Sequence, residues 1–213
     1  MKPNKVDDEN ASKEKYSEWM SKSIKPALDE ILGSEVVNQL QTKTSLLREG
    51  PKTKEIRELN PMVDIHSIQS SLVEMFGCQA GSGLTIQIGR ACFQNLLRYH
   101  GTDLGLSQMP FRLLPLSQKI DQGSEILANF FSDVTHQDIT WEKSENTFTW
   151  QIQNPQDNST QTVSSPICML VRGMLQEAFY WMSSGRTFII KEDCCHRPGE
   201  QACTIQIERN PID

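Results

Sequence analysis

Three cysteines and a glutamate near the end of the chain have the residue types and the spacing of a metal site. Glu192, Cys195 and Cys203 bracket a turn between two predicted strands, and the turn at 196–200 contains a proline and a glycine. Cys168 begins the preceding predicted helix, which must pack on this hairpin. Thiolates and carboxylates are zinc ligands, and four protein ligands with no open position would make the site structural. The spacing is therefore compatible with a structural zinc.

The same residues have a second interpretation. Cys168 could be a small buried hydrophobic residue, and the adjacent Cys194 and Cys195 could have no role in binding. If a metal is bound, Cys194 could replace Cys195, although strand alternation directs neighbouring side chains to opposite faces. His196 is the other possible substitute. The spacing alone leaves these alternatives open.

The elements expected to hold these residues are helices followed by strands. Apolar residues recur at helical spacing over 16–32, 60–77, 84–100, 115–133 and 166–184, with Gly81-Ser82-Gly83 expected to interrupt the chain. Alternating apolar residues predict strands at 139–142, 147–152, 187–192 and 203–207. This order predicts an α+β fold, in which helices pack on an antiparallel sheet built from two hairpins separated by a long helix.

The chain divides into three parts by composition. Residues 1–13 are polar without an apolar period, which predicts a flexible tail. Residues 14–59 are expected to form an N-terminal helical arm and a linker that contains Gly50-Pro51. Residues 60–213 would then form the main domain.

Charge and hydropathy exclude some classes of partner. The 213 residues carry 21 Lys+Arg and 27 Asp+Glu, and this net charge of −6 argues against a nucleic-acid partner. No apolar run approaches the roughly 18 residues needed to span a bilayer, so no transmembrane segment is expected. The first residues lack the apolar stretch of a secretory signal. We therefore expect a cytoplasmic protein, where clustered cysteines more often bind metal than form disulfides.

The cysteine pattern also resembles a known family. The pattern Cys168…Glu192-x-x-Cys195-x7-Cys203 and the stretch Gly89-Arg90-Ala91-x-Phe93 are similar to the 4-vinyl reductase (4VR) domain family over roughly residues 60–209. That family includes sensor domains of phenol- and xylene-responsive regulators and stand-alone proteins of bacteriochlorophyll biosynthesis. Its fold is shared with Bet-type subunits of the TRAPP tethering complex and, more distantly, with haem-based nitric-oxide sensors. The resemblance implies a hydrophobic-ligand cavity beside a structural zinc held by Cys168, Glu192, Cys195 and Cys203.

What the resemblance implies for function is a non-enzymatic binding protein, which we expect to be a homodimer. Its ligand would be a hydrophobic planar molecule, preferably a tetrapyrrole or its precursor. The protein would act as a carrier, assembly factor or regulatory factor in photosynthetic pigment metabolism (bacteriochlorophyll or chlorophyll biosynthesis). The side chains expected to line the cavity are those of Trp141, Trp150, Phe130, Phe179, Tyr180 and Cys92. Indole and hydroxyl groups could orient a polar edge of the ligand. For Cys92 the alternative is a buried free thiol that packs as a small apolar group.

Two other functions and one other cofactor remain as alternatives. The first function is a dimeric interaction scaffold, in which the helix at 16–32 docks on a partner protein. The second is a vinyl reductase with an external electron donor, although no flavin or nicotinamide motif is present. Haem would need a proximal histidine and a Tyr-x-Ser-x-Arg pattern, and this pattern is absent. His100 ends a predicted helix, where a cationic side chain is favourable.

Overall fold

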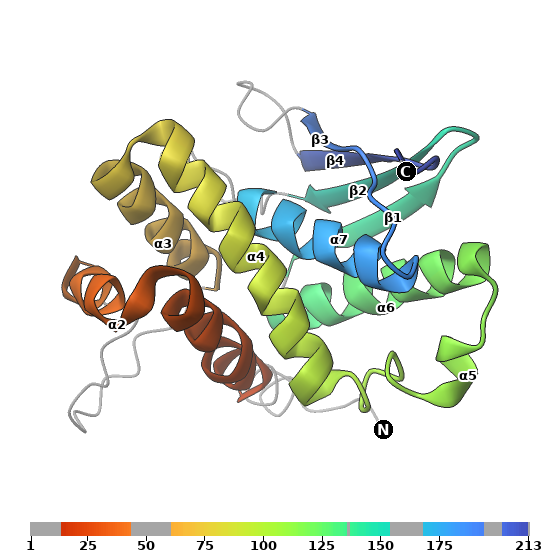
Figure 1. The fold of residues 1–213 in the computed structure, drawn as a ribbon, viewed down its shortest axis with the longest axis horizontal. Helices are drawn as coiled ribbons and strands as arrows, with labels where there is room; N and C mark the ends of the chain where they lie inside the picture. Colours follow the sequence, from red (N-terminus) through yellow and green to blue (C-terminus); the bar gives the residue numbers. More distant parts are fainter. Residues whose placement is uncertain (1–13, 44–60, 136, 154–167, 194–201, 213) are drawn as a thin grey trace, which may run out of the picture.

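The computed structural model describes residues 14–43, 61–135, 137–153, 168–193 and 202–212 (Figure 1). Residues 14–19 are helical and continue into a π-helical turn, η1. The elements are η1 (Met20–Ile24), α2 (Lys25–Lys43), α3 (Pro61–Phe76), α4 (Cys78–His100), α5 (Met109–Arg112), α6 (Leu116–Thr135), β1 (Ile139–Lys143), β2 (Thr147–Gln153), α7 (Cys168–Met182), β3 (Ile190–Asp193) and β4 (Ala202–Glu208). The predicted α+β class, with two hairpins separated by a long helix, is confirmed.

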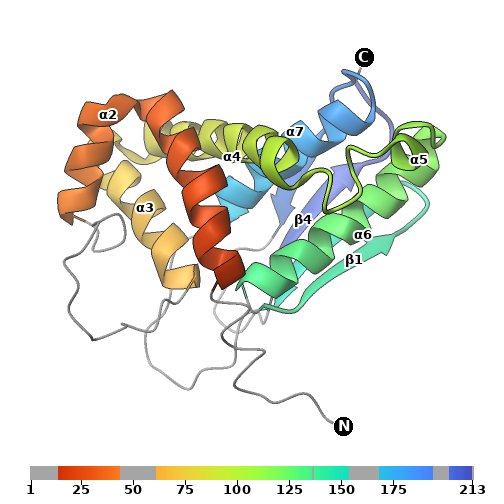
Figure 2. The same cartoon turned by 90° about the horizontal axis from the view of Figure 1, so that it is seen from below.

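The four strands form one antiparallel sheet in the order β1-β2-β4-β3. The two hairpins join through β2 and β4, where Trp150 lies opposite Ile205 and Ile152 lies opposite Cys203. Side chains alternate along both central strands between buried and partly buried positions. Such alternation is the period of a sheet with one face on the core, and helices α6 and α7 cover that face (Figure 2).

Helix α4 runs between the N-terminal helices and α7, and it makes the largest helix contact of the fold with α7 (Figure 1). The two helices touch backbone to backbone at Gly89 and Gly173. A Cβ atom at Gly89 would overlap the carbonyl oxygen of Leu170 and lie 3.0 Å from the Cα of Gly173. A Cβ at Gly173 would overlap the carbonyl oxygen of Ile86. Both positions therefore need glycine.

The helix predicted to begin at residue 84 begins instead at Cys78, so the expected interruption at Gly81-Ser82-Gly83 is wrong. Gly81 is buried in the helix because α3 passes very close to it. A Cβ there would lie 2.7 Å from the backbone nitrogen of Val73. Gly81 thus allows α3 and α4 to approach closely. The local sequence does not distinguish a glycine with this role from one that ends a helix.

The N-terminal helices belong to the same hydrophobic core as the sheet. Tyr16, Trp19 and Leu28 are at most 2% exposed, and they join one cluster with the buried residues of α4, α6 and the strands. The helical run continues past Gly33, where a positive φ of 76° marks a kink. The division into an arm and a main domain stays a prediction, as does the tail at 1–13, which lies outside the described residues.

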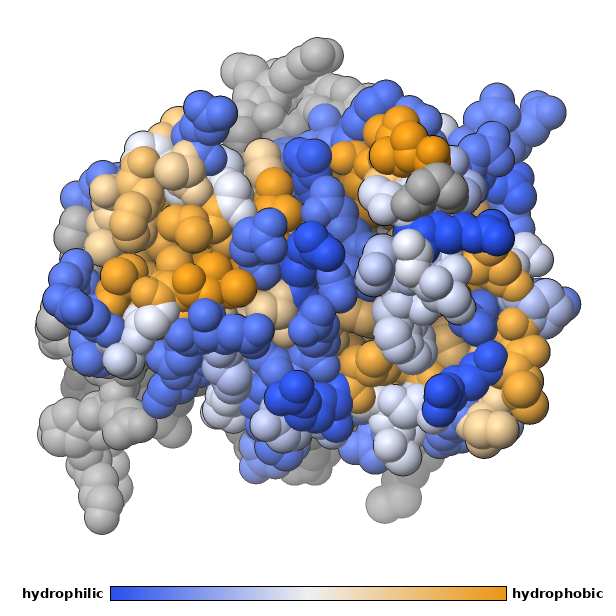
Figure 3. Space-filling view, in the orientation of Figure 1, coloured by the Kyte–Doolittle hydropathy of each residue, from blue (hydrophilic) through white to orange (hydrophobic). Residues whose placement is uncertain are grey.

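Part of the surface is apolar. Figure 3 shows hydrophobic side chains gathered over α3 in this view, beside a band of hydrophilic ones. Phe76, the last residue of α3, is 40% exposed. None of the helices within the described ranges combines the length and the apolar character needed to cross a membrane. The cytoplasmic location and the homodimer stay predictions.

Candidate functional site

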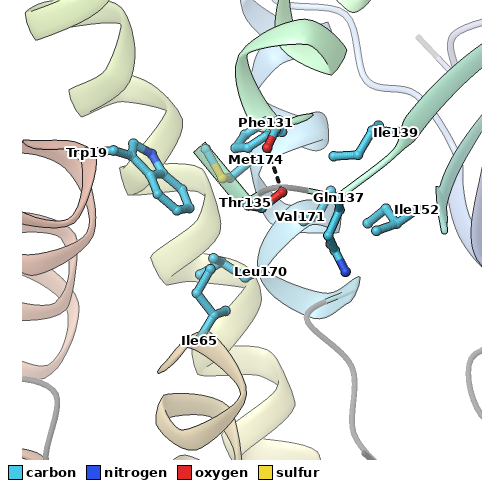
Figure 4. Close-up of a pocket in the computed structure, with 10 residues that line it drawn as sticks. All are labelled: Trp19, Ile65, Phe131, Thr135, Gln137, Ile139, Ile152, Leu170, Val171 and Met174. Carbon is cyan, nitrogen blue, oxygen red and sulfur yellow. Dashed lines mark hydrogen bonds between the residues drawn. The ribbon is translucent and has the colours of Figure 1, made fainter. Parts of the chain in front are cut away.

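A small pocket lies where the N-terminal helices meet the sheet and its two helices (Figure 4). Its volume is about 10 Å³, which is room for about one water molecule. The side chains that line it come from the N-terminal helix, α3, α6, β1, β2, α7 and the link between α6 and β1: Trp19, Ile65, Phe131, Thr135, Gln137, Ile139, Ile152, Leu170, Val171 and Met174. The pocket therefore exists only when the helical part and the sheet part are packed together.

Two lining residues carry polar atoms that have no partner. The indole Nε1 of Trp19 and the amide Nε2 of Gln137 are buried without a hydrogen bond, and the two residues are only 1% and 6% exposed. Leaving a buried donor unsatisfied costs about 1–3 kcal/mol. Thr135 differs, because its hydroxyl donates to the carbonyl oxygen of Phe131 at 2.6 Å. The wall of the pocket is thus apolar, and two residues of its lining carry buried donors without a hydrogen-bond partner.

Aromatic rings fill the interior beside the pocket. Ring centroids are 5.8 Å apart between Trp19 and Phe131, 6.2 Å between Phe131 and Trp150, and 6.5 Å between Trp150 and Trp141. Trp141 stacks on Phe148 at 5.0 Å. These contacts are at distances where aromatic pairs stabilise a core. The rings therefore pack on one another beside the small pocket described above.

None of the six side chains expected to contact a ligand lines this pocket. Trp150, Phe179 and Cys92 are completely buried, Phe130 and Trp141 are partly buried, and Tyr180 is 44% exposed. Contact between these six and a ligand stays a prediction. The residues that do line the pocket from the helical side, Trp19 and Ile65, were seen in the sequence only as apolar positions of helices. The sequence did not indicate a role for Gln137, because this residue lies between a helix and a strand and belongs to no periodic pattern.

The four proposed zinc ligands are only partly within the described residues. Glu192 on β3 lies opposite Ile205, and Cys203 on β4 lies opposite Ile152. Cys168 is the first residue of α7. Cys195, like its possible substitutes Cys194 and His196, lies outside the described residues.

One of the two described ligands does not have the bonding state of a zinc ligand. Cys203 is disulfide-bonded, so its sulfur is not a free thiolate. Burial raises the pKa of the Glu192 carboxyl, Arg172 opposes this effect, and Oε2 of Glu192 has no hydrogen-bond partner. Within the described part of the chain, no group of three or more His, Cys, Asp or Glu side chains could hold a metal ion.

Comparisons with known proteins identify the fold. No protein-family model and no curated protein sequence matches the chain. Among solved structures, the H-NOX protein from S. oneidensis in the Fe(II)NO ligation state has a TM-score of 0.57 at 16% identity, covering 88% of this chain and 98% of that chain. The Fe(II) unliganded H-NOX protein from K. algicida has a TM-score of 0.54 at 12% identity, covering 93% of this chain and 97% of that chain. The chain has the H-NOX fold.

This finding corrects the family resemblance and what followed from it. The similar structures are H-NOX proteins, and no finding supports the 4-vinyl reductase family. The pigment-carrier function is therefore wrong, and neither the scaffold nor the reductase alternative gains support. The structural zinc is also wrong, since the H-NOX structures hold iron and no zinc-binding group is found among the residues described here. Spacing along a chain does not determine which side chains meet around a metal, and this was the weakness of the prediction.

The similar H-NOX structures are in Fe(II) states, and iron in such a fold would need a haem cavity and a ligand side chain. The pocket has the volume of about one water molecule, and no His, Cys or Tyr lines it. Of the four histidines, His100 is the one whose side chain is described, and it ends α4 away from the pocket lining. Its ring packs 6.1 Å from the ring of Phe130. The lining of this pocket therefore does not fit haem.

Proposed function

We propose that this chain is a haem-free regulatory domain of the H-NOX fold, which responds to a small neutral molecule in the pocket between its helical part and its sheet part. The observation that carries this proposal is the lining of the pocket. Side chains from both parts meet there, and none of the ten is charged. The similar H-NOX structures were determined in named ligation states, and this supports a ligand-responsive role for the shared fold.

Occupation of the pocket would be coupled to the position of the N-terminal helix. A molecule larger than water must push Trp19 and Ile65 away from α6 and α7, because these side chains close the pocket on one side (Figure 4). Trp19 packs edge-on against Phe131, with ring centroids 5.8 Å apart at an interplanar angle of 75°. A ligand that binds the separated arrangement better than the closed one shifts the population toward it.

Two polar contacts of the N-terminal helix are weak, which favours such a shift. Lys15 forms an ion pair with Asp133 at 3.1 Å, but both side chains are about 60% exposed. Exposed pairs of this kind contribute about 0–1 kcal/mol. Asn95 donates to the carbonyl oxygen of Ser23 at 3.4 Å, a long hydrogen bond. Apolar packing around Trp19 contributes to holding the helix, and a ligand in the pocket acts on that packing directly.

The test measures hydrogen exchange with a probe, cyclopentanone, at saturating concentration. We expect changed exchange at the amides of residues 14–24 in the whole protein. Val171→Phe fills the pocket and should abolish the change, whereas Leu113→Phe, at a position that is 74% exposed and outside the lining, should preserve it. Haemin added to the same sample should give no stoichiometric Soret complex. Unchanged exchange at saturation, or stoichiometric haem uptake, contradicts the proposal.

A further inference from the structure

The short helix α5 carries exposed apolar side chains beside unpaired positive charges. From this arrangement we infer that the tip of the molecule formed by α5 docks on an anionic phospholipid surface. Met109 and Leu113 enter the interfacial region of the bilayer, and Arg112 and Lys119 lie near the lipid phosphates. The contact is separate from the pocket described above, because no residue of α5 lines that pocket.

The two apolar side chains of the tip stand one above the other on a single helical turn. The backbone N–H of Leu113 donates to the carbonyl oxygen of Met109 at 3.1 Å, and residues with this spacing lie on one face of a helix. Met109 is 62% exposed and Leu113 is 74% exposed. Side chains exposed to this degree project from the surface and do not line a groove. An apolar projection of this kind suits an interface that it can enter, such as the boundary of a bilayer.

The tip is anchored to the core by the residue between these side chains. Phe111 is 5% exposed and stacks on Trp181 of α7, with ring centroids 6.0 Å apart at an interplanar angle of 7°. Trp181 in turn packs against Phe93 of α4 at 6.2 Å. Because the turn is already ordered by this packing, docking does not require it to fold, and the entropic cost of binding is reduced.

The charge of this segment is opposite to that of the chain. Residues 104–120 contain no Asp or Glu, although the whole chain has a net charge of −6. Arg112 is exposed and Lys119 is partly exposed, and neither belongs to an ion pair among the described residues. The nearest acidic residue that follows, Asp121, is already paired with Lys143 at 2.7 Å. The surface that complements the tip is therefore anionic.

A bilayer fits these features better than a protein partner does. A specific protein interface buries about 800 Å² on each side, and two projecting side chains with two cations supply only a small part of such an area. An anionic bilayer accepts a tip of any outline and attracts each Lys or Arg near it. Figures 1 and 2 show α5 at the edge of the molecule. Acidic residues farther from the bilayer than about 8 Å are screened from it at physiological ionic strength.

The experiment measures the partition of the whole protein into sedimented vesicles of phosphatidylcholine, with and without phosphatidylglycerol. We expect binding that requires phosphatidylglycerol and that weakens between about 0.1 M and 1 M salt. Arg112→Glu should lower the partition coefficient about 25-fold, since each unit of charge near an anionic surface changes the affinity about 5-fold. Lys191→Glu makes the same change of charge on β3, away from α5, and should leave the partition coefficient nearly unchanged.

Two serine variants test the apolar side chains. Met109→Ser and Leu113→Ser should each lower the partition coefficient by about 3-fold or more, because each removes apolar surface that enters the bilayer. Both should keep the Tm of the original protein, since the side chains are exposed. Ile212→Ser is the matched control, because Ile212 is 65% exposed but lies at the C-terminal end of the chain. It should bind like the original protein.

Several results would overturn the inference. They are equal binding to vesicles with and without phosphatidylglycerol, no sedimentation with either, and an equal effect of Leu113→Ser and Ile212→Ser. Light scattering of the free protein tests a second copy as the occupant. A dimer that Leu113→Ser dissociates would mean that another chain covers the tip, and this result also overturns the inference. None of these results changes the proposed function, which depends on the pocket alone.

Discussion

The backbone contact between α4 and α7 gives the sharpest prediction, which is that Gly89→Ala destabilises the protein. The Cβ at this position would overlap the carbonyl oxygen of Leu170 and lie 3.0 Å from the Cα of Gly173. A backbone carbonyl inside a helix cannot rotate away as a side chain can. Helices α4 and α7 must therefore move apart, toward the carbon–carbon separation of about 3.5–4.0 Å that is normal in packed interiors.

The size of the effect can be worked out from the local contacts. Overpacking of a core costs about 1–3 kcal/mol, and a rigid backbone contact belongs at the upper end of this range. Alanine recovers about 1 kcal/mol of helix propensity relative to glycine. Separation of the helices also strains the bonds that the buried Glu177 on α7 accepts from Arg90 at 2.9 Å and Gln94 at 2.8 Å on α4. We expect a net loss of at least about 2 kcal/mol in the free energy of unfolding.

Gly83→Ala in the same helix is the matched control, because Gly83 is exposed and no atom lies within 4 Å of its Cβ position. This change should stabilise the protein by about 0.5–1 kcal/mol. Urea unfolding followed by tryptophan fluorescence gives both values. The double variant Gly89→Ala/Gly173→Ala should cost less than the sum of the single variants, since one separation of the helices relieves both overlaps. If Gly89→Ala proves as stable as Gly83→Ala, the packing argument is refuted.

Two further predictions concern ionisable side chains. Burial raises the pKa of the Glu192 carboxyl above its ordinary value of 4.5, so the ionised form lowers folded-state stability progressively as pH rises past that value. Glu192→Gln should therefore stabilise the protein at pH 7 but not at pH 4. The exposed Glu142→Gln is the control and should leave stability unchanged at both pH values. Urea unfolding at pH 7 and pH 4 measures both variants, and destabilisation by Glu192→Gln at pH 7 would contradict the reasoning. Burial also raises the pKa of the Cys92 thiol, so iodoacetamide and peptide mapping of the native protein should find Cys78 modified and Cys92 protected. Equal modification of the two thiols would show that Cys92 is accessible.

The elements that were predicted correctly are those whose signals are local. The alternation Phe148, Trp150, Ile152 produced a strand with one buried face, as the two-residue period of a strand requires. The long apolar helix before the last hairpin was found for the same reason, since helical spacing is visible within a few turns. The α+β class follows from the order of these elements.

The candidate site could not be predicted in this way. Trp19, Ile65 and Gln137 are separated by tens of residues, and nothing near any of them indicates that they meet. The glycines of α4 were misread for a related reason, because only the passing backbone of Val73 explains Gly81 inside a helix. The cysteine and glutamate spacing led to a zinc site because distance along a chain was taken as distance in space.

The sequence by itself determined the local periods, the class of fold and the apolar character of the side chains that form the core. Only the tertiary structure decided that aromatic rings fill the interior, that α4 and α7 meet at Gly89 and Gly173, and that residues far apart in the chain line an uncharged pocket. The physical reason is that period and polarity are properties of neighbouring residues. Packing, by contrast, depends on which distant side chains occupy the same small volume.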